Sequence, residues 1–236
     1  MQPDTVHQDF WTKIMTTYSA LIPAAGFGAR LGEGPKAWLA LDQKPIFVWV
    51  VSKFIGLVDE IVMAVPPDAL AYAETVVQEH GLQVRLIEGG TTRQESIRRM
   101  VAVAHGERVV IHDVARPFAT RSLLGEVIKA GMTHDATAAF LPVEVPVARI
   151  EGGTVKRYLN ASQVALFQTP LAFNRLALLT LLDDAQRDGI ERQSPIQLWL
   201  DAGRQVHPVP GEKNNIKLTT PEDLALAQLL TPYLSR

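Results

Sequence analysis

Short apolar runs and stretches of helical periodicity alternate along most of this chain of 236 residues. The runs at 20–23 and 60–65 have the length of buried strands, and the segments after them repeat apolar residues at helical spacing. A strand–helix–strand order implies right-handed crossovers, which give a mostly parallel sheet with helices on both faces. We therefore predict an α/β fold whose ligands bind beyond the carboxyl ends of the strands.

Capping and turn residues locate the individual elements. Pro45 suits the start of a helix, Gly81 and Gly131 suit helix ends, and Thr92 with Glu95 matches a capping box. The predicted strands cover 20–23, 60–65, 84–87, 108–112 and 136–141, and the predicted helices cover 46–57, 69–80, 92–104, 122–130 and 173–186, with further helices beginning at Ser194-Pro195 and Thr220-Pro221.

The stretch 143–164 interrupts this alternation. Pro146, Gly152 and Gly153 stand among alternating valine and isoleucine residues, a pattern typical of a β-hairpin. We predict that it forms an arm projecting from a single domain at 19–236. Because so short a hairpin cannot bury both its faces, and exposed β edges need covering, we expect a homodimer through the arm. Residues 1–18 are predicted to be a disordered or loosely held tail, with Met15 as an alternative start.

Charge and composition exclude several classes of protein. The 23 basic and 25 acidic residues give a net charge of -2, which argues against a nucleic-acid partner. No apolar run reaches the roughly 18 residues of a membrane span, so no membrane partner is expected. The absence of cysteine excludes disulfides, thiol catalysis and cysteine metal sites. It also suits a cytoplasmic protein.

A glycine-rich loop at 23–36 directly follows the first predicted strand. Gly26 and Gly28 let the backbone approach a ligand closely, and consecutive amide groups there can bind an anion. Arg30 and Lys36 can neutralise a polyphosphate. An ordinary glycine-rich turn with surface cations remains the alternative.

The same loop does not match either of two common phosphate-binding patterns. A dinucleotide-binding loop needs a third glycine where Leu31 stands, and here the glycine comes one residue later, at Gly32. The Walker A pattern is also absent. The loop therefore predicts a polyphosphate site of another kind.

The segment 111–118 follows a buried strand and contains an acid and a base. Asp113 stands where an α/β sheet presents its ligands, and a carboxylate there can hold Mg²⁺ that bridges phosphates. Arg116 can hold a second anionic substrate. The alternative is an aspartate that caps a turn, with the arginine as its partner.

Two further segments give weaker signals. The pair Gly89-Gly90 precedes a capped helix N-terminus, where a base or ribose edge can meet backbone groups, but a plain loop-to-helix junction is equally consistent. Lys217 lies in an apolar, strand-like stretch before the last helix. It faces either solvent or a phosphate, and spacing alone leaves both open.

Histidines and tryptophans are assigned to structure. The histidines show no metal-ligand spacing, and His112 is expected to help hold the loop at Asp113. Trp38, Trp49 and Trp199 are expected to pack in the interior.

Taken together, the motifs resemble one known family. The loop at 23–36, the glycine pair with Ser96, the segment 112–117, Gln168-Thr169-Pro170 and the segment 215–223 occur in the order found in 2-C-methyl-D-erythritol 4-phosphate cytidylyltransferases of the non-mevalonate isoprenoid pathway. The resemblance runs from about residue 20 to the C-terminus. The ribitol-5-phosphate cytidylyltransferases are similar and share most of these motifs.

The resemblance implies a fold, a reaction and a set of site residues. The fold is a Rossmann-like nucleotidyltransferase sheet with a β-arm that interlocks two subunits. The reaction joins CTP to a polyol phosphate, releases pyrophosphate and requires Mg²⁺. The implied CTP-binding residues are Pro23, Ala24, Ala25, Gly26, Gly28, Gly90, Ser96 and Asp113; the catalytic residues are Arg30, Lys36 and Lys217; the acceptor-binding residues are Asp113, Arg116, Thr169 and Lys217; and Asp113 is the metal ligand.

The acceptor side departs from the family pattern. Ala161 replaces an arginine that binds the acceptor phosphate in the family, Pro146 replaces a threonine of the arm, and Gln193-Ser194 replaces a Thr-Asp pair. Leu171 stands where glutamine is usual, and Thr91 where aspartate is. Three hypotheses therefore stay open: the methylerythritol phosphate enzyme, a cytidylyltransferase for another acceptor such as ribitol 5-phosphate, and a catalytically silent CTP-binding homologue.

Overall fold

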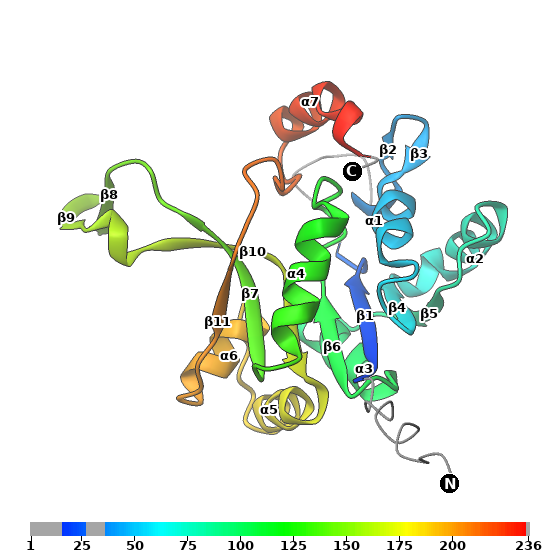
Figure 1. Ribbon diagram of the computed structural model, residues 1–236, viewed down its shortest axis with the longest axis horizontal. Helices are drawn as coiled ribbons and strands as arrows, with labels where there is room; N and C mark the ends of the chain where they lie inside the picture. The colour runs from blue at the N-terminus through cyan, green and yellow to red at the C-terminus, as the bar shows by residue number, and fades with distance from the viewer. Residues whose placement is uncertain (1–15, 27–35, 235–236) are drawn as a thin grey trace, which may run out of the picture.

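The computed structural model describes residues 16–26 and 36–234. They form three layers, with a twisted central sheet between two layers of helices (Figure 1). The predicted α/β class is confirmed, and the predicted strands and helices that begin before residue 190 agree with the observed ones to within three residues at each end.

The central sheet has seven strands in the order β11-β7-β10-β6-β1-β4-β5. Six strands run in one direction and β10 runs against both of its neighbours. The strands are β1 Tyr18–Pro23, β4 Glu60–Val65, β5 Arg85–Glu88, β6 Arg108–Ile111, β7 Ala136–Pro142, β10 Ala165–Asn174 and β11 His207–Pro210, and β2 Ala40–Leu41 pairs with β3 Lys44–Pro45 in a separate small hairpin.

Two apolar cores hold the helices to the sheet. Successive strand residues point to opposite faces, so Ala20 and Ile22 of β1 belong to one core and Leu21 belongs to the other. The first core includes side chains of α1 Ile46–Phe54, α2 Leu70–Glu79, α4 Arg121–Gly131 and α7 Pro221–Leu229, and the second includes side chains of α3 Arg93–Val103, α5 Arg175–Arg187 and α6 Pro195–Asp201. Trp199 is fully buried in the second core, as expected.

The sequence does not predict two strands of the central sheet, β10 and β11, and proline explains both. Proline cannot donate to a strand ladder, so it argues against a strand unless it lies at an edge or an irregularity. In β10, Pro170 lies where the register against β7 shifts, between Gln168 and Leu171. In β11, Pro208 and Pro210 lie on the outermost strand of the sheet.

Local packing corrects several further expectations. β1 already begins at Tyr18, inside the predicted tail, and Gly131 is the last residue of α4. A side chain at Gly131 would collide with the Tyr18 hydroxyl, so this glycine allows a close approach. Glu95 bonds to Thr91, which leaves only half of the predicted capping box at Thr92. The predicted strand-like segment around Lys217 forms no strand.

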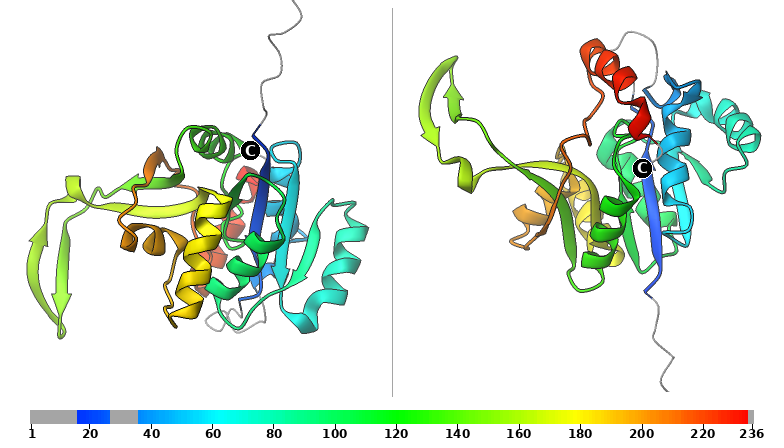
Figure 2. Two further views of the ribbon diagram at one scale, coloured as in Figure 1. Left: turned by 90° about the horizontal axis from the view of Figure 1, so that it is seen from below. Right: turned by 45° about the horizontal axis from the view of Figure 1, so that its top comes forward.

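The predicted hairpin is present as an arm. Strands β8 Val147–Glu151 and β9 Thr154–Leu159 pair antiparallel, and both turn glycines, Gly152 and Gly153, adopt positive φ. Two views show that the arm extends well away from the body (Figure 2). The hairpin itself is confirmed, although its role in dimerisation stays a prediction. No helix within 16–26 and 36–234 has the length and apolarity to cross a membrane.

Candidate active site

Two clefts meet at the carboxyl edge of the sheet, where β1, β5 and β6 end. We call the first the glycine cleft and the second the cationic cleft. Among the described lining residues, Arg93 at the start of α3 is the one that borders both. The predicted binding edge is therefore the edge at which the site residues gather.

The glycine cleft has a volume of about 570 Å³. It is formed by the turn after β1, the turn after β5 and the first turn of α3. Its lining includes Pro23, Ala25, Gly26, Gly89, Gly90, Thr92, Arg93, Ser96 and Arg99. Ala24 is a predicted CTP-binding residue, but it is buried and its N–H bonds to the Ala64 carbonyl, so it supports the turn from within.

The turn at Gly89-Gly90 accepts no larger residue without rearrangement. A Cβ on Gly89 would lie 2.2 Å from that of Ala25, and one on Gly90 would lie 2.4 Å from the Glu95 side chain. The Ser96 hydroxyl accepts from the Gly90 N–H and donates to the Thr92 carbonyl, both at 2.9 Å. Because its hydroxyl proton is already donated to the Thr92 carbonyl, Ser96 stabilises the turn and can only accept a hydrogen bond from cytidine.

The cationic cleft has a volume of about 460 Å³. The residues that line it come from α3, the loop after β6, β10, the loop between α5 and α6, α6 itself and the loop before α7. Its charged lining residues are Arg93, Asp113, Arg116, Asp201 and Lys217.

Asp113 lies between two of these cations. Its Oδ1 is 2.7 Å from Arg93 Nη2, and its Oδ2 is 2.8 Å from Lys217 Nζ. Burial raises the pKa of Asp113, but Arg93 and Lys217 outweigh that effect and hold the pKa well below its usual range. Asp113 is therefore a carboxylate at neutral pH, and the predicted Asp113 and Lys217 are brought together.

A buried hydrogen-bond chain holds Asp113 in place. Burial lowers the pKa of His112 to about 4, so its ring is neutral at pH 7. His112 Nε2 faces the Arg116 carbonyl at 3.0 Å and must carry the proton, so we assign Nδ1 as the acceptor of the Thr169 hydroxyl proton at 3.2 Å. The Thr169 oxygen in turn accepts from the Asp113 N–H at 3.0 Å.

This chain changes the interpretation of Thr169. The resemblance implies that Thr169 binds the acceptor phosphate, and the residue does line the cationic cleft. Its hydroxyl proton, however, is directed to His112 and not into the cleft. The structure favours a positioning role for Thr169, and it confirms that His112 holds the Asp113 loop.

Arg116 lines the cationic cleft and is fixed by the segment before Lys217. Its Nη1 donates to the Asn215 carbonyl at 2.6 Å. Its Nε is buried and has no acceptor among the described residues. The Gln168 side chain also donates to the Asn215 carbonyl, and the Asn215 side chain donates to the Thr169 carbonyl. This network ties β10 to the segment that carries Lys217.

Arg93 is the site residue that sequence reasoning missed. It lies between Gly90 and Ser96, two residues that the resemblance assigns to CTP binding. A signal was present, because a cation in the first turn of a helix opposes the helix dipole unless an anion compensates it. The compensating anion is Asp113, which comes from the loop after β6.

The described residues offer one fitting way to hold Mg²⁺. Residues 16–26 and 36–234 contain no cluster of three or more His, Asp or Glu side chains that could hold a metal ion by themselves. Mg²⁺ is nevertheless commonly held by one or two carboxylates together with substrate phosphates. Asp113 suits that arrangement, because it lines the cationic cleft next to Arg93, which borders both clefts.

Three predicted residues cannot be placed fully. Gly28 and Arg30 lie outside the described residues, as does the side chain of Lys36, whose backbone begins the short helix Lys36–Trp38. Of the positions that depart from the family pattern, Gln193 lines the cationic cleft, whereas Ala161 lies in the short helix Ala161–Gln163 that follows the arm strands.

Known proteins share this architecture along most of the chain. Residues 18–232 match the model of the family described as 2-C-methyl-D-erythritol 4-phosphate cytidylyltransferase. An enzyme of that name from Thermus thermophilus is 37% identical over 212 residues, covering 90% of this chain and 96% of the relative. One from Bacillus cereus is 35% identical over 217 residues, covering 89% and 96%.

Solved structures agree with the sequence matches. A crystal structure of the Thermus thermophilus enzyme superposes with a TM-score of 0.79 at 34% identity, covering 92% of this chain and 99% of that one. The synthase of 4-diphosphocytidyl-2C-methyl-D-erythritol from Anaerococcus prevotii has the same fold, with a TM-score of 0.81 over 94% and 97% of the two chains. This chain belongs to the 2-C-methyl-D-erythritol 4-phosphate cytidylyltransferase family.

Proposed function

We propose that the glycine cleft binds CTP, that the cationic cleft binds 2-C-methyl-D-erythritol 4-phosphate, and that the protein transfers a cytidylyl group between them. The observation that carries this proposal is the position of Asp113, held between Arg93 and Lys217 at the junction of the two clefts. A backbone-lined cleft suits a nucleotide, and an adjoining cluster of cations suits a phosphorylated acceptor.

The chemistry is an in-line displacement. An oxygen of the acceptor phosphate attacks the α-phosphorus of CTP, the bond from that phosphorus to the bridging oxygen breaks, and pyrophosphate leaves. No covalent enzyme intermediate is needed, because positioning and stabilisation of the developing charge supply the catalysis. The product is a cytidine diphosphate ester of the acceptor.

The cations of the site have different roles. Arg30 and Lys36 stabilise the triphosphate, a role that rests on their place in the glycine-rich loop. Lys217 and Arg93 lie next to Asp113 and stabilise charge where the two substrates meet. Arg116 is a cation that lines the cationic cleft, which supports it as a ligand of the acceptor phosphate.

Mg²⁺ is part of the proposal, with Asp113 as its protein ligand. When bound, the ion neutralises charge on the phosphates of CTP. Asp113, which is ionised at neutral pH, would hold the ion in place of its contact with Lys217 or Arg93. Thr169 and His112 would keep the carboxylate oriented.

A second acceptor is favoured by one observation. Ala161 stands where the family pattern has a phosphate-binding arginine, and Leu171, which lines the cationic cleft, stands where glutamine is usual. Loss of a charged contact to phosphate costs about 2 kcal/mol. Ribitol 5-phosphate is therefore the alternative acceptor.

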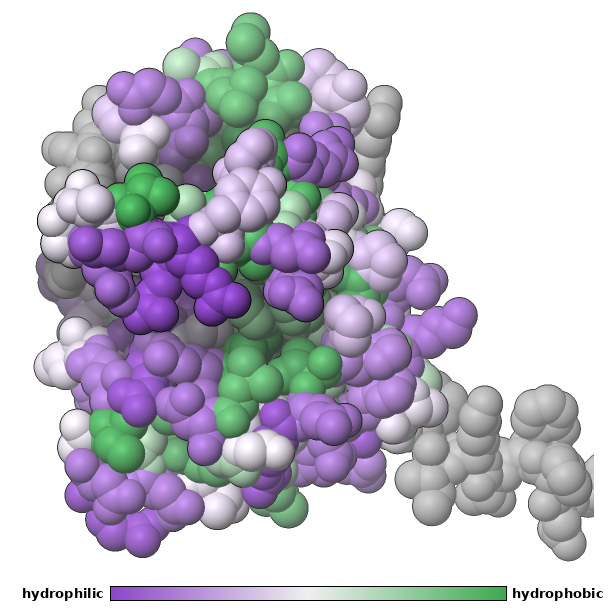
Figure 3. Space-filling view, turned by 90° about the vertical axis from the view of Figure 1, so that its left-hand side faces the viewer, coloured by the Kyte–Doolittle hydropathy of each residue, from purple (hydrophilic) through white to green (hydrophobic). Residues whose placement is uncertain are grey.

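We also propose that the protein acts as a homodimer through the arm. Val145, Ile150, Val155 and Tyr158 are each more than half exposed on or beside β8 and β9. Figure 3 looks onto the side from which the arm projects and shows apolar side chains lying between hydrophilic ones. A second copy would cover the exposed apolar surface of the arm. Sedimentation at micromolar concentration should give a dimer, and a monomer would reject this part of the proposal.

The lack of cysteine supports a cytoplasmic location.

The decisive experiment measures pyrophosphate release with CTP and Mg²⁺ against a panel of polyol phosphates. Turnover with 2-C-methyl-D-erythritol 4-phosphate well above that with ribitol 5-phosphate is the expected result. The reverse preference would establish the alternative acceptor. Binding of CTP by calorimetry without turnover on any acceptor would identify a silent homologue.

A further inference from the structure

The loop between α5 and α6 forms one wall of the cationic cleft. Its residues Gln193 and Ser194 line that cleft, and Ser194 then caps α6. The loop is exposed along most of its length, and Ile190, its one large apolar side chain, is itself partly exposed. Apolar burial therefore does little to fix the wall on which an acceptor would rest.

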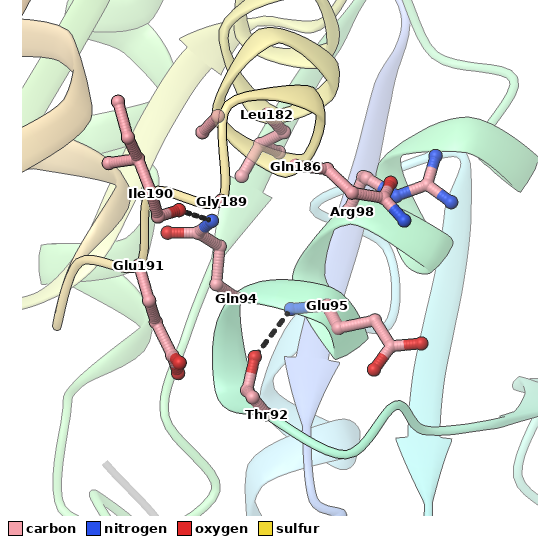
Figure 4. Close-up of a pocket in the computed structure, with 10 residues that line it drawn as sticks. Thr92, Gln94, Glu95, Arg98, Leu182, Gln186, Gly189, Ile190 and Glu191 are labelled. Carbon is pink, nitrogen blue, oxygen red and sulfur yellow. Dashed lines mark hydrogen bonds between the residues drawn. The ribbon is translucent and has the colours of Figure 1, made fainter.

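Close packing does not fix the loop from behind either. A small cavity of about 230 Å³ separates it from α3 and α5, lined among others by Leu182, Gln186 and Ile190 (Figure 4). The residues around this cavity have room to move. The position of the loop must come from polar contacts.

The side chain of Gln94 supplies two of these contacts. Its Nε2 donates to the Ile190 carbonyl at 2.8 Å, and its Oε1 accepts from the Arg192 N–H at 2.9 Å. Figure 4 shows the first of these bonds reaching across the cavity from α3 to the loop. One amide group thus uses both its donor and its acceptor on two backbone groups of the loop.

The neighbouring Arg93 links the same loop to Asp113. Its Nη1 donates to the Gln193 carbonyl at 3.2 Å, while its Nη2 bonds to Asp113 at 2.7 Å. Both contacts start from the first turn of α3, the same turn that lines the glycine cleft. That turn therefore sets the distance between Asp113 and the acceptor wall.

We propose that Gln94 is a positioning residue for the acceptor: its amide clamps the loop at 190–192 and thereby places Gln193 and Ser194 on the cationic cleft. The inference rests on the proposed function and goes beyond it, because Gln94 touches neither cleft. Gln94 lines the small cavity behind the loop and not the glycine cleft proposed for CTP. Loss of the Gln94 amide should therefore weaken binding of the acceptor and leave binding of CTP unchanged.

Steady-state kinetics of two variants test the role in catalysis. Gln94→Ala removes both bonds, and Gln94→Glu keeps the size but turns a carboxylate oxygen toward the Ile190 carbonyl. Each should raise the KM for the acceptor roughly tenfold, the effect of losing one or two hydrogen bonds, with the KM for CTP changed less than about twofold. A role in stability alone would lower Tm and leave both KM values unchanged.

Gln186 provides the matched control. It is the same residue type, it lines the same cavity, and its side chain makes no hydrogen bond to the described residues. Gln186→Ala should leave both KM values at the parent level. An effect on the acceptor equal to that of Gln94→Ala would overturn the clamp.

Hydrogen exchange tests the clamp without any turnover. In the parent protein the Arg192 N–H is protected by Gln94, so Gln94→Ala should speed its exchange roughly tenfold or more, and Gln186→Ala should not. Unchanged exchange at Arg192 overturns the proposal. Faster exchange with an unchanged acceptor KM overturns the catalytic role. A parent protein inactive on every acceptor would instead reject the proposed function, while the exchange result still decides the clamp.

Discussion

The glycine cleft and the cationic cleft share Arg93 but are built in different ways. The glycine cleft is formed by two turns that each follow a strand and by the first turn of α3. The cationic cleft is made of charged side chains that come from separate elements between Arg93 and Lys217. Each turn of the first cleft is a short contiguous motif, whereas the charged cluster of the second exists only in the folded protein.

The difference predicts which kind of substitution damages each cleft. A cleft formed by tight glycine turns is damaged by added volume, because a Cβ on Gly89 or Gly90 would collide with its neighbours. A cleft made of ion pairs is damaged by loss of a single charge, because the remaining partners are left uncompensated. Substitutions of the two kinds should therefore affect different substrates.

Removal of Lys217 should give the largest effect. Lys217→Ala takes away a cation beside Asp113, and we expect kcat/KM for the acceptor to fall about 100-fold, consistent with a charged hydrogen bond of roughly 1.5–3 kcal/mol. Pyrophosphate release gives the measurement. Lys213→Ala is the control, because Lys213 pairs with Glu144 at the surface. Equal losses in the two variants would contradict the assignment.

The buried Lys53 supports the cationic cleft from behind, and its charge should make stability depend on pH. Its Nζ donates to the carbonyls of Pro117 and Ala119 just after Arg116, and burial lowers its pKa to about 8. Between that value and the ordinary pKa of about 10.4 the unfolded chain binds more protons than the folded one, so stability should rise with pH.

Denaturant unfolding at two pH values checks this expectation. Between pH 7.5 and pH 9.5, the free energy of unfolding of the parent protein should rise by about 2 kcal/mol relative to that of Lys53→Met. The two bonds persist, since a neutral amine still has two N–H donors. A difference between parent and variant that does not change with pH would show that burial does not perturb Lys53.

Added volume in the glycine cleft should weaken the binding of CTP and not that of the acceptor. A Cβ on Gly26 meets nothing within 4 Å, so Gly26→Ala should fold normally but occupy space that the nucleotide needs. We expect the KM for CTP to rise about tenfold, near the lower end of the cost of overpacking. Gly125→Ala in α4 also enters open space and should leave the KM unchanged. A rise in the acceptor KM instead would mean that the clefts are assigned the wrong way round.

The smallest expected effect is a gain. Ala161→Arg restores the arginine of the family pattern, and we expect the KM for 2-C-methyl-D-erythritol 4-phosphate to fall about fivefold while that for CTP stays constant, as for one exposed charged contact. Competition with ribitol 5-phosphate in the same assay shows whether selectivity follows. An unchanged KM together with tight binding in the parent would show that another residue, such as Arg116, already holds the phosphate.

Local signals predicted much of this protein. Most strands and helices up to α5, with β2, β3 and β10 as exceptions, depend on periodicity and on residues a few positions apart, which the sequence displays directly. The same is true of the arm turn at Gly152-Gly153 and of the caps at Ser194 and Thr220. The glycine turns and Asp113 were predicted for the same reason, since each directly follows a strand. The family motifs were likewise short and contiguous.

Only the tertiary structure decided what depends on contacts between distant residues. Strands β10 and β11 violate the local rule against proline, and they form because a register shift and an edge position accommodate Pro170, Pro208 and Pro210. Arg93 becomes a site residue only because folding brings it to Asp113, which then holds Lys217 as well. Thr169 loses its freedom to donate into the cleft because folding places His112 beside it. Ion pairs and hydrogen bonds act over a few ångströms of space, and sequence separation does not measure that distance.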